Sequence, residues 1–246
     1  MPRHPTARRS IALIIAAIAV TAGACATGDA TTEPTSPATV TTVPLSVVPV
    51  DYQGFLRQPT ACGAEQPTTA VDMKFDAPGD AGVAGPTTVT LSTSCGPLVI
   101  ELDPRTAPET VNSFVFLAEE GYFDGTASHR VIPGFMMQAG DPTATGLGGP
   151  GYAIPDELPG DAMTYERGVV AMANAGPGTA GSQFFILFGD ADWLPPRYSI
   201  FGRVTDGFTT LDAIEAIPLG QSPTSSDSTP STPLNSLFIE SVTVSR

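Results

Sequence analysis

The stretch SHRVIPGFMMQAGD, residues 128–141, most constrains what this chain can fold into, because Pro133 and Gly134 separate two short apolar runs within it. Proline and glycine together interrupt a strand, and alternate side chains of a strand point to the same face. The residues that share a face before the break are Ser128, Arg130 and Ile132. The stretch therefore predicts two strands joined by a turn, with one cation on an otherwise apolar face.

After the break, Met136 and Gln138 share a face. If the turn lays the second strand beside the first, the guanidinium of Arg130, a thioether and an amide converge with Phe135 over one shallow apolar patch. Such a surface suits a substrate that is apolar but carries amide groups. On this stretch alone, two core strands with an isolated arginine are an equal alternative.

Two later stretches favour the binding surface, AMANAGPGTAGSQFFILF at residues 171–188 and DWLPPRYSIFGRV at residues 192–204. Together the three stretches resemble the cyclophilin signature, which reads HRVIPGFMxQxGD, then MANAGPxTxGSQFFI, then WL and FG at the expected spacing. Three long matches in the right order are far more specific than one short motif. The resemblance covers roughly residues 87–246 and says nothing about the first third of the chain.

Strand and helix patterns in this region predict an all-β barrel or sandwich with two helices. TTVTLSTS and LVIELD, on either side of a turn at residues 95–97, predict a hairpin. A capping box of Thr106 and Glu109 begins a helix that runs to residue 121, and a second helix is predicted for residues 205–217. Residues 221–233 predict a polar loop, and LFIESVTV predicts the last strand. The resemblance implies a closed eight-stranded antiparallel barrel, capped by a helix at each end, with a substrate groove on its outer face.

The resemblance also implies an activity, peptidyl-prolyl cis-trans isomerisation without a metal or other cofactor, and a role for each site residue. Arg130 is the catalytic cation, Gln138 and Gln183 orient it and the peptide, and Trp193 favours the binding of cyclosporin. The proline socket consists of Phe135, Met136, Phe185, Leu194 and Tyr198. The residues that hold the substrate backbone are Ala173, Asn174 and Ala175. A cyclophilin-like proline-peptide binding module or chaperone with little turnover is the alternative function.

Strand parity within GSQFFI supports these roles, because Gln183 and Phe185 share one face and leave Phe184 and Ile186 for the core. Two positions depart from the family pattern. Tyr198 stands where many members have histidine, which keeps an aromatic wall but changes its hydrogen-bond chemistry. Ser128 replaces an aromatic residue and removes packing behind Arg130.

The N-terminus resembles a bacterial secretory signal over residues 1–24. Arg3, Arg8 and Arg9 precede IALIIAAIAV, an apolar run of ten residues, whereas a spanning helix needs about 20. Ala22, Gly23 and Ala24 before Cys25 resemble a lipobox, although leucine usually stands at the position of Ala22. We expect a lipidated Cys25 and an extracytoplasmic, membrane-anchored protein. An ordinary cleavage site near Ala24, giving a secreted protein, is the alternative.

Residues 25–50 are rich in Thr, Pro and Ala and predict a disordered tether. Residues 51–86 form an extension of uncertain structure, in which Val71, Met73 and Phe75 alternate as in an edge strand. The isomerase domain is assigned to residues 87–246. Cys62 and Cys95 are an even pair in an oxidising compartment, so they predict a disulfide, with two buried thiols as the alternative.

Composition and charge limit the partners. Without residues 1–24 the chain keeps 8 of its 11 basic residues and all 25 acidic ones, so its net charge is 8 − 25 = −17. Such a chain repels nucleic acid, and proline-containing segments of client proteins are the expected partners. His129 is the one histidine left in the mature chain, so no metal-ligand set is expected. The chain has no GxSxG motif, which disfavours a hydrolase built on His129.

Overall fold

The computed structural model describes residues 48–160, 163–222 and 224–246. The predicted signal peptide, Cys25 and most of the predicted tether lie outside the described residues. Within the described part of the chain, none of the helices combines the length and the hydropathy needed to cross a membrane.

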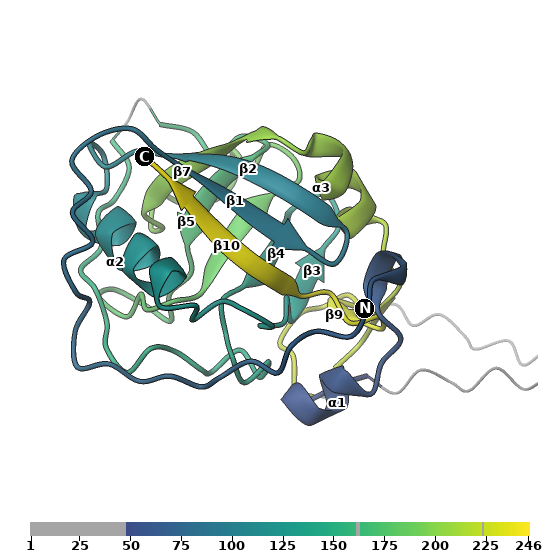
Figure 1. Ribbon diagram of the computed structural model, residues 1–246. Coiled ribbons are helices and arrows are strands. Elements are labelled where there is room, and N and C mark those ends of the chain that lie inside the picture. Colours follow the sequence, from purple (N-terminus) through teal and green to yellow (C-terminus); the bar gives the residue numbers. More distant parts are fainter. Residues whose placement is uncertain (1–47, 161–162, 223) are drawn as a thin grey trace, which may run out of the picture. The chain divides into compact units, whose positions relative to one another are not determined.

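One antiparallel sheet of eight strands forms the body of the fold, in the order β10-β1-β2-β7-β5-β6-β4-β3. Figure 1 shows β10 lying beside β1 and the sheet curling away from them. The predicted hairpin is confirmed as β1 with β2, and the predicted last strand is β10, which pairs with β1. The strands are β1 (Thr87–Thr93), β2 (Gly96–Leu102), β3 (Arg130–Ile132), β4 (Met136–Ala139), β5 (Val169–Met172), β6 (Phe184–Leu187), β7 (Ile200–Asp206) and β10 (Ile239–Ser245).

The sheet is open, whereas the prediction was a closed barrel. Its outer strands β3 and β10 share no ladder among the described residues. The chain before β3 approaches the chain before β10 through one isolated bridge, between Ala127 and Phe238. The N–H of Ser128 also donates to the carbonyl of Leu237, at 2.8 Å. Where these two edges of the sheet come together, irregular hydrogen bonds therefore take the place of a ladder.

Alternation along the strands separates two apolar clusters. Val131, Met137 and Ile186 lie opposite one another on β3, β4 and β6 and belong to the main core. Met136 and Phe185, at intervening positions, belong to a second cluster on the other face. This second cluster is the floor of the candidate site, so each strand that supports the site also fills the core.

Two longer helices cover parts of the sheet (Figure 1), α2 (Pro108–Glu119) against β10 and α3 (Phe208–Glu215) against β2 and β4. Both were predicted, but the capping box was wrong. The carboxylate of Glu157 accepts the N–H groups of Glu109 and Thr110, at 3.0 and 2.8 Å, while Thr106 Oγ1 donates to the carbonyl of Asp103. The start of α3 was also wrong, because residues 205 and 206 extend β7 and the helix begins at Phe208.

The extension before β1 contains the helix α1 (Tyr52–Leu56), which packs against Ala127 and Phe238, and the 3₁₀ turn η1 (Ala61–Gly63). The predicted edge strand is wrong, since residues 71–75 form no strand. Met73 and Phe75 nevertheless pack against the core, and Phe75 N–H donates to the carbonyl of Pro150 at 2.7 Å. The alternation therefore belongs to a segment without strand pairing, in which Met73 N–H donates to the carbonyl of Val71 at 2.9 Å and Val71 is exposed.

The predicted disulfide is present and joins this extension to the sheet. Cys62 in η1 is bonded to Cys95 in the β1–β2 turn, with their Cα atoms 5.0 Å apart. Beside it, the N–H of Ala61 donates to the carbonyl of Ser236 at 2.9 Å. The extension is thus attached both covalently and through main-chain bonds.

Candidate active site

The site begins with the register of three strands. Arg130 of β3 pairs with Gln138 of β4, and Gln138 pairs in turn with Phe185 of β6. Side chains at paired positions share a face and lie next to one another. The convergence predicted for Arg130 and Gln138 is therefore present, with Phe185 continuing the row.

The turn between β3 and β4 brings Phe135 to this face. Pro133 and Gly134 occupy its two central positions, and Phe135 N–H donates to the carbonyl of Ile132 at 3.0 Å. Gly134 has a φ of 73°, which the third position of a type II turn requires and glycine adopts without strain. Its N–H donates to a carboxylate oxygen of Glu215 at 2.7 Å, so α3 anchors the turn.

A pocket of about 540 Å³ opens over this row. The predicted residues that line it are Arg130, Phe135, Met136, Gln138, Ala173, Asn174, Phe185, Trp193, Leu194 and Tyr198. Four further lining residues were not predicted, namely Ile132, Asp227, Ser228 and Thr229. The sequence prediction thus covers the floor and the aromatic wall, and misses the side made by Asp227, Ser228 and Thr229.

Aromatic side chains form the wall of the pocket. Phe135 and Trp193 lie 4.8 Å apart between ring centroids, and Tyr198 meets Phe185 edge to face at 5.4 Å. Phe185 is 5% exposed, whereas Trp193 is 67% exposed. A buried ring at the base and an exposed indole at the rim suit an apolar ring held at the edge of a peptide chain.

Tyr198 is held by its main chain. The hydroxyl of Tyr165 donates to the Tyr198 carbonyl at 2.9 Å and accepts the Tyr198 N–H at 3.1 Å. Burial raises the pKa of Tyr165 above its usual value, so this hydroxyl keeps its proton at neutral pH. The residue that replaces the family's histidine is thus fixed by a neighbouring phenol.

Three polar side chains form a row along the pocket. Arg130 donates from one terminal nitrogen to Gln138 Oε1 at 3.1 Å, and Gln138 Nε2 donates to Gln183 Oε1 at 2.9 Å. Gln183 Nε2 then donates to the carbonyls of Gly146 and Gly148, at 3.0 and 2.9 Å. These bonds fix the orientation of both amides, and Gln138 presents a defined face to the pocket.

The predicted backbone-binding residues lie where this pocket meets a neighbouring one of about 430 Å³, which Ala175 and Gln183 also line. Two of their N–H groups are already bonded. Ala173 donates to the carbonyl of Gln183 at 2.9 Å, and Ala175 donates to Thr179 Oγ1 at 2.8 Å. A strand-like substrate would therefore use the carbonyls of this segment and the N–H of Asn174.

Asp227 was missed by the sequence analysis, which assigned residues 221–233 to a polar loop. The loop leaves the short strand β8 (Leu219–Gly220) and returns at β9 (Thr232–Pro233). It places both carboxylate oxygens of Asp227 on Arg130, at 2.8 Å from Nε and 2.5 Å from a terminal nitrogen. These bonds lower the pKa of Asp227 to about 2, so the pair is ionised at neutral pH.

His129 faces a different environment from Arg130. Its Nδ1 is buried, with no hydrogen-bond partner among the described residues. Burial lowers the pKa of His129 to about 4, so the ring is neutral at pH 7. The nearby carboxylate of Asp141 is instead bound by Thr143, Thr145 and Gly146. This arrangement gives no hydrolytic triad, and the described residues contain no cluster of three or more metal-ligating side chains.

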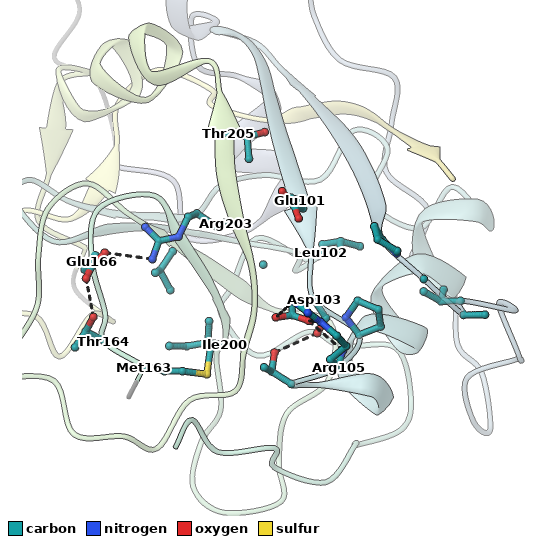
Figure 2. A pocket seen from close by; sticks show the side chains of 18 residues that line it. Glu101, Leu102, Asp103, Arg105, Met163, Thr164, Glu166, Ile200, Arg203 and Thr205 are labelled. Atoms are coloured by element: carbon teal, nitrogen blue, oxygen red, sulfur yellow. Dashed lines mark hydrogen bonds and ion pairs between the residues drawn. The ribbon is translucent and has the colours of Figure 1, made fainter. Parts of the chain in front are cut away.

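A larger pocket, of about 840 Å³, lies elsewhere and contains none of the predicted site residues. Figure 2 shows it between β2, β7 and neighbouring loops. Four of its five charged side chains are paired with one another, Arg105 with Asp103 at 3.1 Å and Arg203 with Glu166 at 3.2 Å. These four charges already have a partner, so size alone does not make this pocket the chemical site.

Comparison with known proteins gives consistent matches. A family model described as cyclophilin type peptidyl-prolyl cis-trans isomerase/CLD matches residues 88–244. The chain is 41% identical over 159 residues to peptidyl-prolyl cis-trans isomerase-like 3 of Rattus norvegicus, covering 63% of this chain and 94% of that protein. It is 46% identical over 132 residues to peptidyl-prolyl cis-trans isomerase-like 1 of Mus musculus, covering 52% of this chain and 80% of that protein.

Solved structures extend the comparison to the fold. A cyclophilin type peptidyl-prolyl cis-trans isomerase of Cryptosporidium parvum matches with a TM-score of 0.59 and 33% identity, over 66% of this chain and 99% of that one. The structure of that protein in the presence of the dipeptide Ala-Pro matches with a TM-score of 0.59 and 34% identity, over 65% of this chain and 99% of that one.

Proposed function

The chain belongs to the family of cyclophilin-type peptidyl-prolyl cis-trans isomerases, and from that premise we propose that it assists the folding of extracytoplasmic proteins by stabilising the twisted X-Pro amide with Arg130. Isomerase activity is that of its named relatives. The cellular setting and the role of Arg130 are the proposal. The observation that carries it is a guanidinium, 34% exposed, at the edge of a pocket whose apolar side chains include Phe135, Met136 and Phe185.

The reaction needs a cation or donor and no nucleophile. Rotation about the peptide bond is opposed by amide resonance, a barrier of about 18 to 20 kcal/mol. In the twisted state the proline nitrogen becomes pyramidal and gains a lone pair, while the carbonyl turns away from it. A fixed charge that meets this arrangement only when the amide is twisted lowers the barrier without tightening substrate binding.

The chain supplies the other requirements around Arg130. Phe135, Met136 and Phe185 offer an apolar socket for the proline ring. Gln138 and Gln183 hold defined amide orientations, and Asn174 lies where the flanking peptide would run. The reaction requires that the chain on each side of the X-Pro bond be held in place while rotation occurs about that bond.

An exchange measurement tests this function. The purified protein should accelerate cis/trans exchange in a short peptide with one Ala-Pro bond, measured by NMR exchange spectroscopy. Spontaneous exchange takes tens to hundreds of seconds, so a faster rate is readily detected. A folded protein that binds the peptide but leaves its exchange at the spontaneous rate would move the function to the alternative, a proline-peptide binding module.

The proposed cellular setting rests on residues 1–25. We propose that Cys25 carries lipid and anchors the mature protein outside the cytoplasm, on the strength of the apolar run and the small residues before Cys25. Replacing Cys25 by serine should release the protein from membranes in a fractionation experiment. Unchanged membrane association would leave the lipid anchor without support.

Cyclosporin sensitivity is a further proposal, supported by Trp193 at the rim of the pocket, 67% exposed and 4.8 Å from Phe135. Cyclosporin should inhibit the isomerase by competing with the peptide. Trp193→Ala should weaken that inhibition more than it slows isomerisation, because the indole lies at the exposed rim of the pocket.

A further inference from the structure

Arg130 is bound side-on by a carboxylate that no motif of the sequence identifies. Asp227 accepts from Nε at 2.8 Å and from a terminal nitrogen at 2.5 Å, across a separation of 97 residues. Two parallel bonds between a guanidinium and a carboxylate fix the plane of the guanidinium as well as its position. The side chain of Asp227 is only 11% exposed, so solvent competes weakly for this pair.

The loop holds Asp227 in place independently of Arg130. The N–H of Asp227 donates to Ser225 Oγ at 3.1 Å, and its carbonyl accepts from Gln221 Nε2 at 3.0 Å. Beyond it, the carbonyl of Ser231 accepts the N–H of Val131, the central residue of β3, at 2.8 Å. The loop that carries the Asp227 carboxylate is therefore hydrogen-bonded to β3, the strand that carries Arg130.

Counting donors shows that the pair leaves Arg130 able to act. A guanidinium has five N–H groups. Two are donated to Asp227 and one to Gln138, which leaves one on each terminal nitrogen for a bound peptide. Because Asp227 and Arg130 both line the pocket of about 540 Å³, the carboxylate holds the cation from one side while the pocket stays open.

We propose that Asp227 is a positioning residue for isomerisation, which fixes the guanidinium of Arg130 so that its remaining N–H groups face the peptide. This inference rests on the proposed role of Arg130. It assigns a function to the loop between β8 and β9, which makes one side of the pocket through Asp227, Ser228 and Thr229. The low pKa of Asp227 means that the carboxylate stays ionised, and able to hold Arg130, throughout the neutral range.

The test is a double-mutant cycle on the full-length protein, with kcat/KM and peptide affinity measured for wild type, Asp227→Asn, Arg130→Ala and the double variant. Asp227→Asn keeps the shape but removes the charge and the paired geometry. We expect it to lower kcat/KM roughly 10-fold, less than the 10²-fold that a displacement of about 1 Å can cause. Peptide affinity should change less than about twofold, because the socket is intact. In the Arg130→Ala background the same substitution should have almost no effect.

A matched control breaks another short ion pair. Arg167 and Asp212 lie 2.6 Å apart on the surface, with side chains 38% and 60% exposed. Asp212→Asn should leave kcat/KM unchanged, which shows that losing an aspartate charge is not itself the cause.

Wild-type protein offers a second readout that needs no variant at Asp227. The Nε–H of Arg130 should be as rigid as the backbone, with an NMR order parameter near 0.85 rather than below about 0.6.

The outcomes separate the two claims. If Arg130→Ala loses activity but Asp227→Asn does not, the positioning role is wrong and the proposed role of Arg130 stands. If Arg130→Ala is fully active, the proposed function fails first. An increase in kcat/KM for Asp227→Asn would show that the carboxylate competes with the substrate. If Asp227→Asn lowers kcat/KM as much in the Arg130→Ala background as in wild type, Asp227 acts elsewhere. A mobile Nε–H of Arg130 would contradict the fixed geometry.

Discussion

His129 and Arg130 are adjacent in sequence but differ in what their environments allow. Arg130 is charged, paired and partly exposed, whereas His129 is kept neutral by burial, with Nδ1 unpaired among the described residues. A buried group that must stay uncharged makes stability depend on pH. His129 therefore lies next to the site and affects the stability of the fold, although the proposed mechanism does not use it.

The stability of the protein should fall as pH drops from about 6.5 to about 4. The pKa of His129 lies near 4 in the folded protein, so over this range only the unfolded chain binds the proton. The loss should be roughly 3 kcal/mol, and it should disappear in His129→Asn. Denaturant unfolding at several pH values measures it. Asp227 and Asp141 titrate in a lower window and do not mask it, since the pKa of each is lowered. The same slope in the variant would contradict the assignment.

At the residue level, the site residues within the cyclophilin motifs were predicted on strands and loops alike, and those in the loop between β8 and β9 were not. Alternation places Arg130 and Gln138 on the site face, whereas the role of Phe185 came from the resemblance, with which strand parity agrees. Asp227 could not be predicted in this way. It lies among serines, threonines and prolines with no period, and its distance from Arg130 depends on how the loop folds back. A lone acidic residue in such a loop was the available signal.

The start of α2 shows how tertiary contacts replace local signals at the scale of an element. Thr106 and Glu109 have the spacing of a capping box, yet Thr106 bonds to Asp103 and the helix starts at Pro108. Glu157 supplies the cap from a loop 47 residues beyond Thr110, through bonds to two N–H groups and to the hydroxyl of Thr110 at 2.7 Å. A carboxylate at a helix N-terminus also interacts favourably with the helix dipole.

Glu157→Ala should therefore lower the free energy of unfolding by about 1 kcal/mol, the usual cost of losing an N-terminal cap. Thr106→Ala, at the position that the sequence pattern favours, should change it by less than about 0.5 kcal/mol. Urea unfolding of the two variants beside wild type measures both values. A larger loss for Thr106→Ala than for Glu157→Ala would restore the capping box.

At the scale of the whole molecule, the order of strands and helices followed from their patterns, and the closure of the sheet did not. A closed barrel was expected, but closure depends on whether two distant edges form a ladder. Here β3 and β10 share no ladder, and residues 125–128 make irregular bonds to residues 237–239. Apart from its predicted disulfide, the packing of the extension was equally beyond prediction, because its other contacts are single hydrogen bonds and scattered apolar side chains such as Met73 and Phe75.

The disulfide should contribute strongly to the stability of this arrangement. Cys62 and Cys95 are 33 residues apart, and closing a loop of that length restricts the unfolded chain by about 3.5 to 4 kcal/mol on the chain-entropy model. The double variant Cys62→Ser/Cys95→Ser should lose roughly that free energy of unfolding in a urea titration. Free-thiol labelling of native wild-type protein should detect neither cysteine without reductant. A stability loss below about 1 kcal/mol would mean that the bond restricts little.

The central claim is that Arg130 acts on the twisted amide, and the most direct test compares catalysis with binding in Arg130→Ala. Removing one preorganised donor of this kind costs about 10²- to 10³-fold in rate, so kcat/KM should fall by that factor while peptide affinity, measured by NMR titration, changes little. Arg130→Lys should recover only part of the rate, because an ammonium cannot reproduce the planar contacts with Asp227 and Gln138. Equal losses of kcat/KM and affinity in Arg130→Ala would make Arg130 a recognition residue and contradict the account.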